Sequence, residues 1–254
     1  MSGPDAADAA VGADLTRDGF LGGRLWLWQP RRGYRAATDA VFLAAFVPAR
    51  PGERVLDLGC GVGTAALCLA RRVDGLDLHG LELQPAYAAL ARRNAAENGV
   101  ALAVHEGDVT RPPPALAPGS FDQVFANPPF HHPGTAPAAD AGRDRANREG
   151  AARLADWVAA GVRLLAPGGT LTMIHRHDRL REFMAALGPD LGVALLPLAP
   201  RAGRPAKRVL ARIRAGAGVE TLPPFIVHAG DRHVADGDDY SAEARAVLRD
   251  VAAI

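Results

Sequence analysis

The four consecutive residues Asn127-Pro128-Pro129-Phe130 combine groups that can hold a planar amine. The side-chain oxygen of Asn127 and the carbonyl of Pro128 can each accept one N–H bond of an exocyclic amino group, which orients its nitrogen for attack on an electrophile. The prolines stiffen the loop, and Phe130 offers a ring face for stacking. A turn that ends a strand explains the same residues, since Asn-Pro is common there.

A glycine-rich loop upstream supplies a second chemical signal. The apolar residues 55–58 run into Gly59-x-Gly61-x-Gly63, where the missing Cβ atoms let the backbone turn sharply and approach a nucleotide. A dinucleotide fingerprint would place glycine where Thr64 stands. The spacing therefore favours a different nucleotide cofactor over a nicotinamide dinucleotide.

Three acidic residues follow or end successive expected strands. Asp57 would repel a pyrophosphate but suits an ammonium group, Glu82 can accept two ribose hydroxyls, and Asp108 can accept from an adenine amino group. Each of them also fits a role as the cap of a turn or helix. Their positions at three strand ends favour ligand binding, because open α/β sheets bind ligands there.

The elements that must position these residues alternate along the chain. Strands are expected at 54–58, 76–81, 101–105, 121–126 and 170–175, and helices at 64–72, 85–97, 149–165 and 178–187. This alternation predicts a doubly wound α/β fold with a mostly parallel sheet. Later strands at 193–198 and 208–214 lack a helix between them, which predicts an antiparallel hairpin at the edge of a seven-stranded sheet. A short strand at 225–228 and a helix at 242–252, capped by Ser241, complete the pattern.

The N-terminal part is expected to form an arm on this core. Residues 1–18 read as a disordered lead-in, and 19–30 as a β-hairpin with Gly22-Gly23 at its turn. Thr38 or Asp39 is expected to cap a helix through residues 40–46. We therefore expect one domain over 19–254, made of an arm at 19–50 and a core at 51–254.

Composition argues against a disulfide-stabilised, a metal-binding or a membrane-spanning protein. The 254 residues are 48% hydrophobic and 22% charged, with a net charge of +1, which is ordinary for a soluble protein and leaves room for a local basic patch. Cys60 and Cys68 are too few for a disulfide framework and lack metal-ligand spacing, so no metal is expected. No apolar run approaches ~18 residues, so we expect a cytoplasmic protein without a membrane span. Its oligomeric state is open, and a monomer is compatible with the sequence.

The glycine loop and Asn-Pro-Pro-Phe together resemble the class I S-adenosylmethionine-dependent methyltransferases. Three further motifs resemble the bacterial N6-adenine methyltransferases that modify valine tRNA beside the anticodon. They are Gln29-Pro30-x-x-Gly33-Tyr34-Arg35-x-x-Thr38-Asp39-Ala40, Pro205-Ala206-Lys207-Arg208-Val209-Leu210 and Tyr240-Ser241-x-Glu243. This resemblance runs from about Leu21 to the C-terminus. It implies S-adenosylmethionine as cofactor, S-adenosylhomocysteine as product and tRNA as partner.

The resemblance also implies a set of site residues. The N-terminal segment of the family folds over the cofactor, which would bring Tyr34, Thr38 and Asp39 to its methionine end. The expected cofactor residues are Tyr34, Thr38, Asp39, Asp57, Gly59, Gly61, Gly63, Glu82, Asp108 and Asn127, and the catalytic ones are Asn127, Pro128, Pro129 and Phe130. The expected RNA contacts are Arg35, His131, Arg204, Lys207 and Arg208, within a wider group that includes Arg31, Arg32 and Arg201. His131 and His132 also fit solvated loop residues, and 133–144 fits a lid or a loose loop.

Other acceptors remain open. Methyltransferases of guanine N2 in ribosomal RNA share Asn-Pro-Pro-Phe-His but carry an extra N-terminal domain. Enzymes that methylate a glutamine amide of release factors share the motif with Tyr in place of Phe130. A cofactor-binding module without catalysis and a nicotinamide dehydrogenase are the remaining alternatives.

Overall fold

The computed structural model of the chain describes residues 14–31, 35–129, 152–232 and 239–254. The strands are β1 (Leu15–Phe20), β2 (Leu25–Pro30), β3 (Arg54–Leu58), β4 (Asp77–Glu82), β5 (Leu102–Glu106), β6 (Phe121–Ala126), β7 (Leu165–Arg176), β8 (Leu191–Ala199), β9 (Arg208–Ala215), β10 (Val219–Thr221) and β11 (Phe225–Ile226). The helices are α2 (Thr38–Phe46), α3 (Thr64–Arg72), α4 (Pro85–Glu97), α6 (Leu154–Leu164), α7 (Leu180–Ala186) and α8 (Ala242–Asp250), with the short 3-10 helices η1 (Leu21–Gly23) and η2 (His177–Arg179).

The large sheet has the strand order β10-β8-β9-β7-β6-β3-β4-β5, and β11 pairs with β8 beside this row. β3 is parallel to both β4 and β6, β4 is parallel to β5, and β6 is parallel to β7. β9 runs antiparallel to its neighbours β7 and β8. The chain first builds β3, β4 and β5 in one direction and then places β6 and β7 on the other side of β3. Open α/β sheets bind ligands in a crevice at such a reversal, which here lies between the carboxyl ends of β3 and β6.

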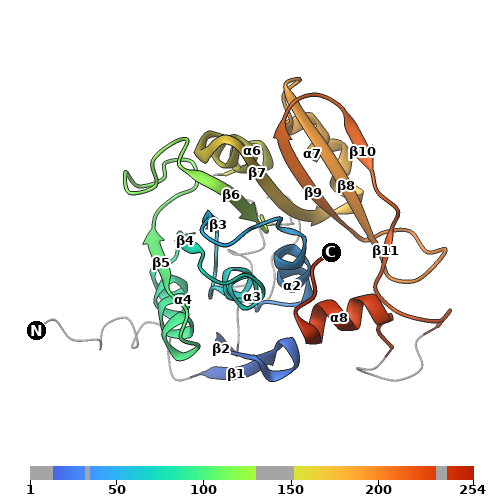
Figure 1. Cartoon of the computed structure of the whole chain (residues 1–254), viewed down its shortest axis with the longest axis horizontal. Helices are drawn as coiled ribbons and strands as arrows, with labels where there is room; N and C mark the ends of the chain where they lie inside the picture. The colour runs from blue at the N-terminus through green and yellow to red at the C-terminus, as the bar shows by residue number, and fades with distance from the viewer. Residues whose placement is uncertain (1–13, 32–34, 130–151, 233–238) are drawn as a thin grey trace, which may run out of the picture.

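Helices cover both faces of the sheet (Figure 1). α2, α3 and part of α4 share an apolar cluster with one face, whereas α6 and α7 share a second cluster with the other face. β6 contributes to both, because Phe125 belongs to the first cluster and Val124 to the second. The apolar residues 124–126 at its end are thus explained by burial on two sides.

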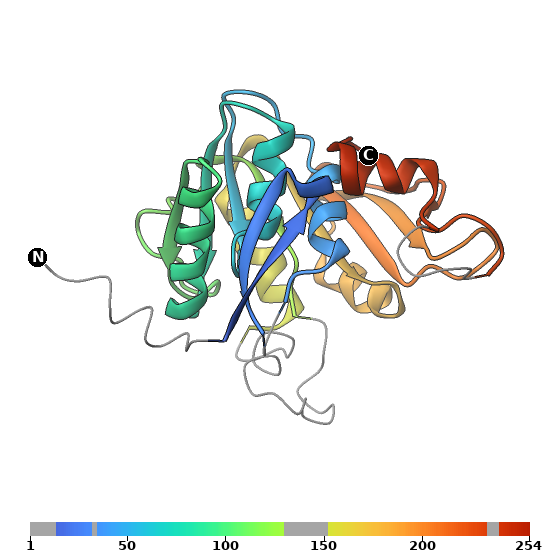
Figure 2. The same ribbon diagram turned by 90° about the horizontal axis from the view of Figure 1, so that it is seen from below.

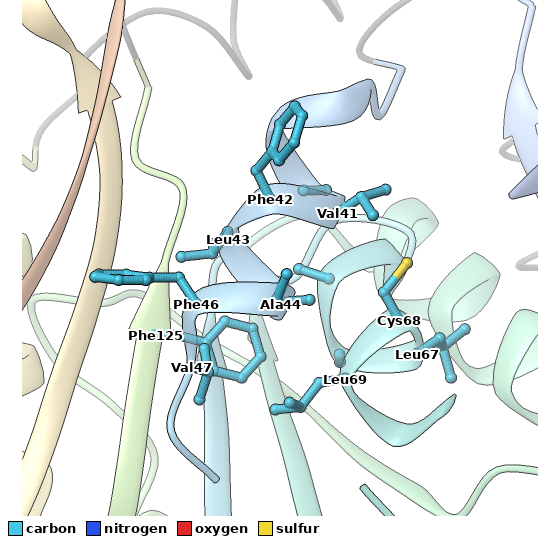
Figure 3. Packing of buried hydrophobic residues seen from close by; sticks show 14 of the residues in the cluster. Val41, Phe42, Leu43, Ala44, Phe46, Val47, Leu67, Cys68, Leu69 and Phe125 are labelled. Carbon is cyan, nitrogen blue, oxygen red and sulfur yellow. The ribbon is translucent and has the colours of Figure 1, made fainter. Parts of the chain in front are cut away.

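Helix α2 is the most completely buried of these helices. All seven residues from Ala40 to Phe46 are buried, so the helix is apolar all round rather than on one stripe. In Figure 3 its side chains meet Leu67, Cys68 and Leu69 of α3 on one side and approach Phe125 of β6 on another. The helix therefore ties the segment just after the N-terminal hairpin to the centre of the domain.

The hairpin of β1 and β2 lies across α3 and α4 as a separate two-stranded sheet (Figure 2). Two asparagines one turn apart attach β2, one in the last turns of α4 and the other at its C-cap. Asn94 bonds both backbone groups of Trp28, and Asn98 bonds both backbone groups of Trp26. The side-chain amides thus take the place of a neighbouring strand along this edge of β2.

Most expected elements are confirmed, and a few boundaries are corrected. The large sheet has nine strands in the described ranges instead of seven, because β10 and β11 extend it beyond β8. β1 begins at Leu15, inside the segment expected to be disordered, since it pairs with β2 along its full length. α2 has Ala37 as its N-cap and no side-chain cap bond, so the expected Thr38 or Asp39 cap is wrong. α6 begins at Leu154, and the first residues of the helix expected at 149–165 lie outside the described ranges.

Ser241 caps α8 as expected, because its hydroxyl accepts the Ala244 N–H at 3.0 Å. The expected lid at 133–144 lies outside the described residues. Within the described ranges, no helix combines the length and apolar character that a membrane span requires.

Candidate active site

The register of the parallel strands gathers the expected site at one edge of the sheet. Leu58 of β3 pairs with Leu81 of β4 and with Ala126 of β6. The next residue of each strand segment, which is Gly59, Glu82 and Asn127 respectively, therefore reaches the same level of the sheet. The glycine loop, one acidic residue and the proposed transfer residue are thus neighbours in space although they are distant in sequence.

The glycine loop adopts a backbone that only glycine takes without strain. Gly59, Gly61 and Gly63 have φ values of +70°, +56° and +87°, all in the left-handed region. At Gly59 a second constraint acts, because a Cβ atom there would lie 2.6 Å from Cη2 of Trp157. The buried Trp157 ring of α6 therefore packs against the loop at Gly59. The sequence around Trp157 did not predict this contact.

Glu82 fastens the loop to the end of β4. Its carboxylate accepts the N–H of Gly61 at 2.9 Å and the N–H of Gln84 at 2.8 Å. Burial raises the pKa of Glu82, and these backbone bonds partly offset that rise. A carboxylate has about four lone-pair positions, so the backbone bonds leave acceptor capacity for a hydroxyl donor of a ligand. A bond to the turn before α4 and a ribose contact are therefore compatible roles for Glu82.

Leu83 is a site candidate that the sequence did not reveal. It follows Glu82 directly and is 61% exposed, which makes it one of the three most exposed large apolar residues in the described ranges. An exposed leucine at the mouth of a ligand crevice can cover a flat aromatic ring. In the sequence, the only indication of this role was that an apolar residue follows the expected strand at 76–81.

Asp57 lies below the loop, with its carboxylate bonded to the N–H of Ala66 in α3 at 3.2 Å. Burial raises the pKa of Asp57 from 3.8 to about 8, the Ala66 bond acts against this rise, and the charge of Glu82 adds to it. Near neutral pH the carboxyl group holds its proton in the absence of a positive partner. A ligand ammonium would supply the charge that favours the ionised form.

This burial of Asp57 predicts a pH-dependent stability. Because the folded protein holds the Asp57 proton more tightly than the unfolded chain, the free energy of unfolding falls as pH rises from about 4 to about 8. The contribution approaches about 1.4 kcal/mol per pH unit for one proton. Denaturant unfolding of the ligand-free protein at pH 5, 6.5 and 8 should show this decline, and Asp57→Asn should flatten it. The same pH dependence in both proteins would contradict the assignment.

Asn127 and the prolines follow β6 at the crevice. Pro128 is buried, whereas Asn127 and Pro129 are half-buried, and Phe130 lies outside the described residues. The sequence missed their neighbour His175, which is buried near the end of β7 and interacts with the backbone of Pro129. Burial and the charge of Arg179 lower the pKa of His175 to about 4. Its ring is therefore neutral at neutral pH and supports the loop as an uncharged group.

Asp108 lies beyond the end of β5 and forms a local turn. Its Oδ1 accepts the N–H of Thr110 at 2.8 Å and the hydroxyl of Thr110 at 2.9 Å. These bonds fit the alternative in which the residue caps a turn. The half-buried carboxylate nevertheless lies at the same sheet edge as Glu82, since Glu106 of β5 pairs with Glu82 of β4.

The basic residues expected to face RNA divide into two groups. Four of them form ion pairs within the chain. Arg35 pairs with Asp18 at 2.7 Å, Arg208 with Asp39 at 2.8 Å, Arg31 with Asp14 at 2.6 Å, and Arg201 with Asp239. Arg204 and Lys207 are exposed and have no ion-pair partner in the described part of the chain. Lys207 adjoins the crevice edge, since its carbonyl accepts the N–H of His177 just after β7 at 3.1 Å.

The remaining expected residues have mixed outcomes. Thr38 and Asp39 are the first two residues of α2, and Asp39 pairs with Arg208 at the start of β9. Tyr34, Arg32, His131 and His132 lie outside the described residues. In the ranges that the structure describes, no group of three or more His, Cys, Asp or Glu side chains is suited to a metal ion. Cys60 and Cys68 are free and buried.

The donor and acceptor groups of the crevice fit S-adenosylmethionine. Asp57 can face its ammonium group, Glu82 its ribose, and Leu83 its adenine ring. Glycine at position 59 lets the loop keep this shape, because a Cβ atom there would lie 2.6 Å from the Trp157 ring.

Comparison with known proteins gives two kinds of similarity. The family described as "Methyltransferase small domain" matches residues 36–187, which include the glycine loop and Asn-Pro-Pro-Phe. A tRNA1(Val) (adenine(37)-N6)-methyltransferase from Yersinia pseudotuberculosis serotype O:3 (strain YPIII) is 28% identical over 212 residues, which cover 80% of this chain and 82% of the relative.

Solved structures share the fold. A predicted O-methyltransferase from Agrobacterium tumefaciens has a TM-score of 0.66 and 25% identity, and covers 85% of this chain and 98% of its own. TrmN from Thermus thermophilus has a TM-score of 0.50 and 23% identity, and covers 69% of this chain and 48% of its own.

Proposed function

Since the chain belongs to the methyltransferase small domain family, we propose that it transfers a methyl group from S-adenosylmethionine to the N6 amine of an adenine in tRNA. The main support for this proposal is the strand register, which brings Gly59, Glu82 and Asn127 to the same level of the sheet at the ends of β3, β4 and β6. Asn127 and Pro128, which we assign as the acceptors of the amine, follow β6 beside the loop that we assign to the cofactor. The arm at 19–50 and the core at 51–254 act as one domain in this proposal.

Asn127 and Pro128 have separate roles in the proposed reaction. S-adenosylmethionine, when bound, supplies a methyl group on a positively charged sulfonium. Asn127 accepts one N–H bond of the amine through its side-chain oxygen, and the Pro128 carbonyl accepts the other. These two bonds orient the nitrogen lone pair toward the methyl group. No strong base is required, because the cationic amine formed by transfer loses its proton to water.

Adenine in tRNA is the acceptor that the relatives and the motifs favour together. The Yersinia relative carries that substrate in its name, and the match covers four fifths of both chains. The motifs around Tyr34, Lys207 and Ser241 lie outside the glycine loop and Asn-Pro-Pro-Phe, so they add independent support. The two exposed cations Arg204 and Lys207 offer phosphate contacts on the same edge as the crevice.

The acceptor test uses labelled S-adenosylmethionine with total tRNA, ribosomal RNA and release factor, followed by analysis of the labelled products. We expect label in N6-methyladenosine from tRNA. Label in N2-methylguanosine from ribosomal RNA, or in methylated glutamine from the release factor, would replace the adenine assignment with the corresponding alternative. Absence of label in all acceptors would contradict catalysis.

The phosphate contacts give a separate prediction. Arg204→Ala and Lys207→Ala should each weaken tRNA binding several-fold at low salt and make the affinity less dependent on salt, because each removes about one phosphate contact. Arg50→Ala is the matched control, since Arg50 is exposed just before β3 at the opposite edge of the sheet. Filter binding over a range of salt concentrations measures both effects. Equal losses in all three variants would show that the two cations act only through the net charge.

A further inference from the structure

Asn94 of α4 is a fully buried amide that joins two separate parts of the chain. Its Oδ1 accepts the N–H of Trp28 at 2.7 Å, and its Nδ2 donates to the carbonyl of Trp28 at 3.1 Å. The second N–H of the same Nδ2 donates to the carbonyl of Val62 at 2.9 Å. One side chain therefore binds the N-terminal hairpin and the centre of the glycine loop at once.

Apolar packing reinforces this connection. Val62 is buried and shares a small cluster with Tyr87 and Leu90 of α4, against which Trp28 and Leu15 of the hairpin pack. Val62 thus belongs to one apolar cluster with residues of both strands of the hairpin, in addition to its bond with Asn94. A displacement of the hairpin changes the surroundings of the loop residue between Gly61 and Gly63.

Asn98 provides an internal comparison. It is the C-cap of α4, one turn beyond Asn94, where its Oδ1 accepts the N–H of Trp26 at 3.1 Å and its Nδ2 donates to the carbonyl of Trp26 at 2.7 Å. Its remaining N–H donates to the carbonyl of Asn94 within the helix at 2.7 Å. Asn98 therefore holds the hairpin with the same chemistry as Asn94 but has no bond to the glycine loop.

We propose that Asn94 is a positioning residue that fixes the glycine loop in its cofactor-binding shape and couples that shape to the docked N-terminal hairpin. This inference rests on the proposed use of the loop for S-adenosylmethionine. Without Asn94, the Val62 carbonyl loses its donor in a buried place and the loop relaxes to recover a partner. Binding of the cofactor must then restore the original shape. The coupling is reciprocal, so an occupied loop also holds the hairpin more firmly.

The variants Asn94→Ala and Asn98→Ala separate positioning from simple attachment. We expect Asn94→Ala to weaken S-adenosylhomocysteine binding by about tenfold, which corresponds to about 1.4 kcal/mol, and Asn98→Ala by less than about twofold. With Asn94→Ala, the KM for S-adenosylmethionine should rise by a similar factor while kcat stays within about twofold. Calorimetry and steady-state kinetics, run well below the melting temperature of each variant, measure these effects. If Asn94→Ala does not fold, Asn94→Ser provides the second variant.

Hydrogen exchange of the unaltered protein tests the reciprocal effect. Saturation with S-adenosylhomocysteine should slow exchange of the Trp28 amide, and in Asn98→Ala this slowing should persist. Equal loss of affinity in the two alanine variants, or exchange at Trp28 that ignores the ligand, would overturn the positioning role. Failure of the unaltered protein to bind S-adenosylhomocysteine would instead overturn the proposed function from which the inference starts.

Discussion

Replacement of Asn127 by alanine is expected to lower kcat for methyl transfer by about a hundredfold or more while the affinity for S-adenosylhomocysteine stays within about twofold. The removed oxygen holds the amine in the orientation for transfer, and loss of one such preorganised group typically costs about 10²–10³ in kcat. Asn127 follows β6 beside the loop but supplies none of the backbone that shapes it. Single-turnover kinetics with tRNA and calorimetry with the product measure the two quantities.

Asn127→Asp is the matched variant for this test. Its side chain keeps an acceptor oxygen of the same reach, so it should retain clearly more activity than Asn127→Ala. A parallel fall of kcat and cofactor affinity in the alanine variant would contradict the assigned role. It would place Asn127 among the residues that shape the cofactor site instead.

A methyl group added at Gly59 is expected to eliminate cofactor binding, with a loss of at least about a hundredfold in affinity for S-adenosylhomocysteine. Alanine at φ +70° costs about 1–2 kcal/mol in any protein. At this position the new Cβ also lies 2.6 Å from the buried Trp157 ring, so the loop or α6 must move. Overpacking of this kind costs about 1–3 kcal/mol more. Calorimetry and denaturant unfolding of Gly59→Ala measure both consequences.

Gly75→Ala separates the two costs. Gly75 also has φ +70°, but a Cβ there meets no atom within 4 Å, and the residue lies between α3 and β4 at the other edge of the sheet. This variant should lose about 1–2 kcal/mol of stability and keep its affinity for the cofactor. If Gly59→Ala loses no more than Gly75→Ala in either measurement, the contact with Trp157 does not shape the site.

Local signals predicted the elements that carry the site. α3 and α4 begin and end at the expected residues, because Gly63 and Thr64 open the first and Pro85 and Asn98 bound the second. The strand ends at Leu58 and Ala126 could also be predicted, because each apolar run stops at a loop rich in glycine or proline. Parallel pairing then brought Asp57, Glu82 and Asn127 to one edge without further information.

Interactions between distant residues account for what the sequence did not reveal. Asn94 reads as an ordinary polar residue of α4, and its role depends on Trp28 and Val62, which are remote along the chain. In the sequence Arg35 and Arg208 resemble free cations, whereas in the structure they pair with Asp18 and Asp39. β10 has three exposed residues and exists only because β8 lies beside it.

The strand order β7-β9-β8 has a consequence for synthesis on the ribosome. β8 pairs with β9, β10 and β11, all of which are translated after it, and β7 receives its second neighbour only when β9 arrives. From the end of β8 at Ala199 to the end of β9 at Ala215, elongation at ~5–20 residues per second takes about 1–3 seconds. During this interval the nascent chain carries an open edge on β7 and an unpaired β8. Translation of residues 199–215 is therefore the stage at which association with other chains most directly competes with folding.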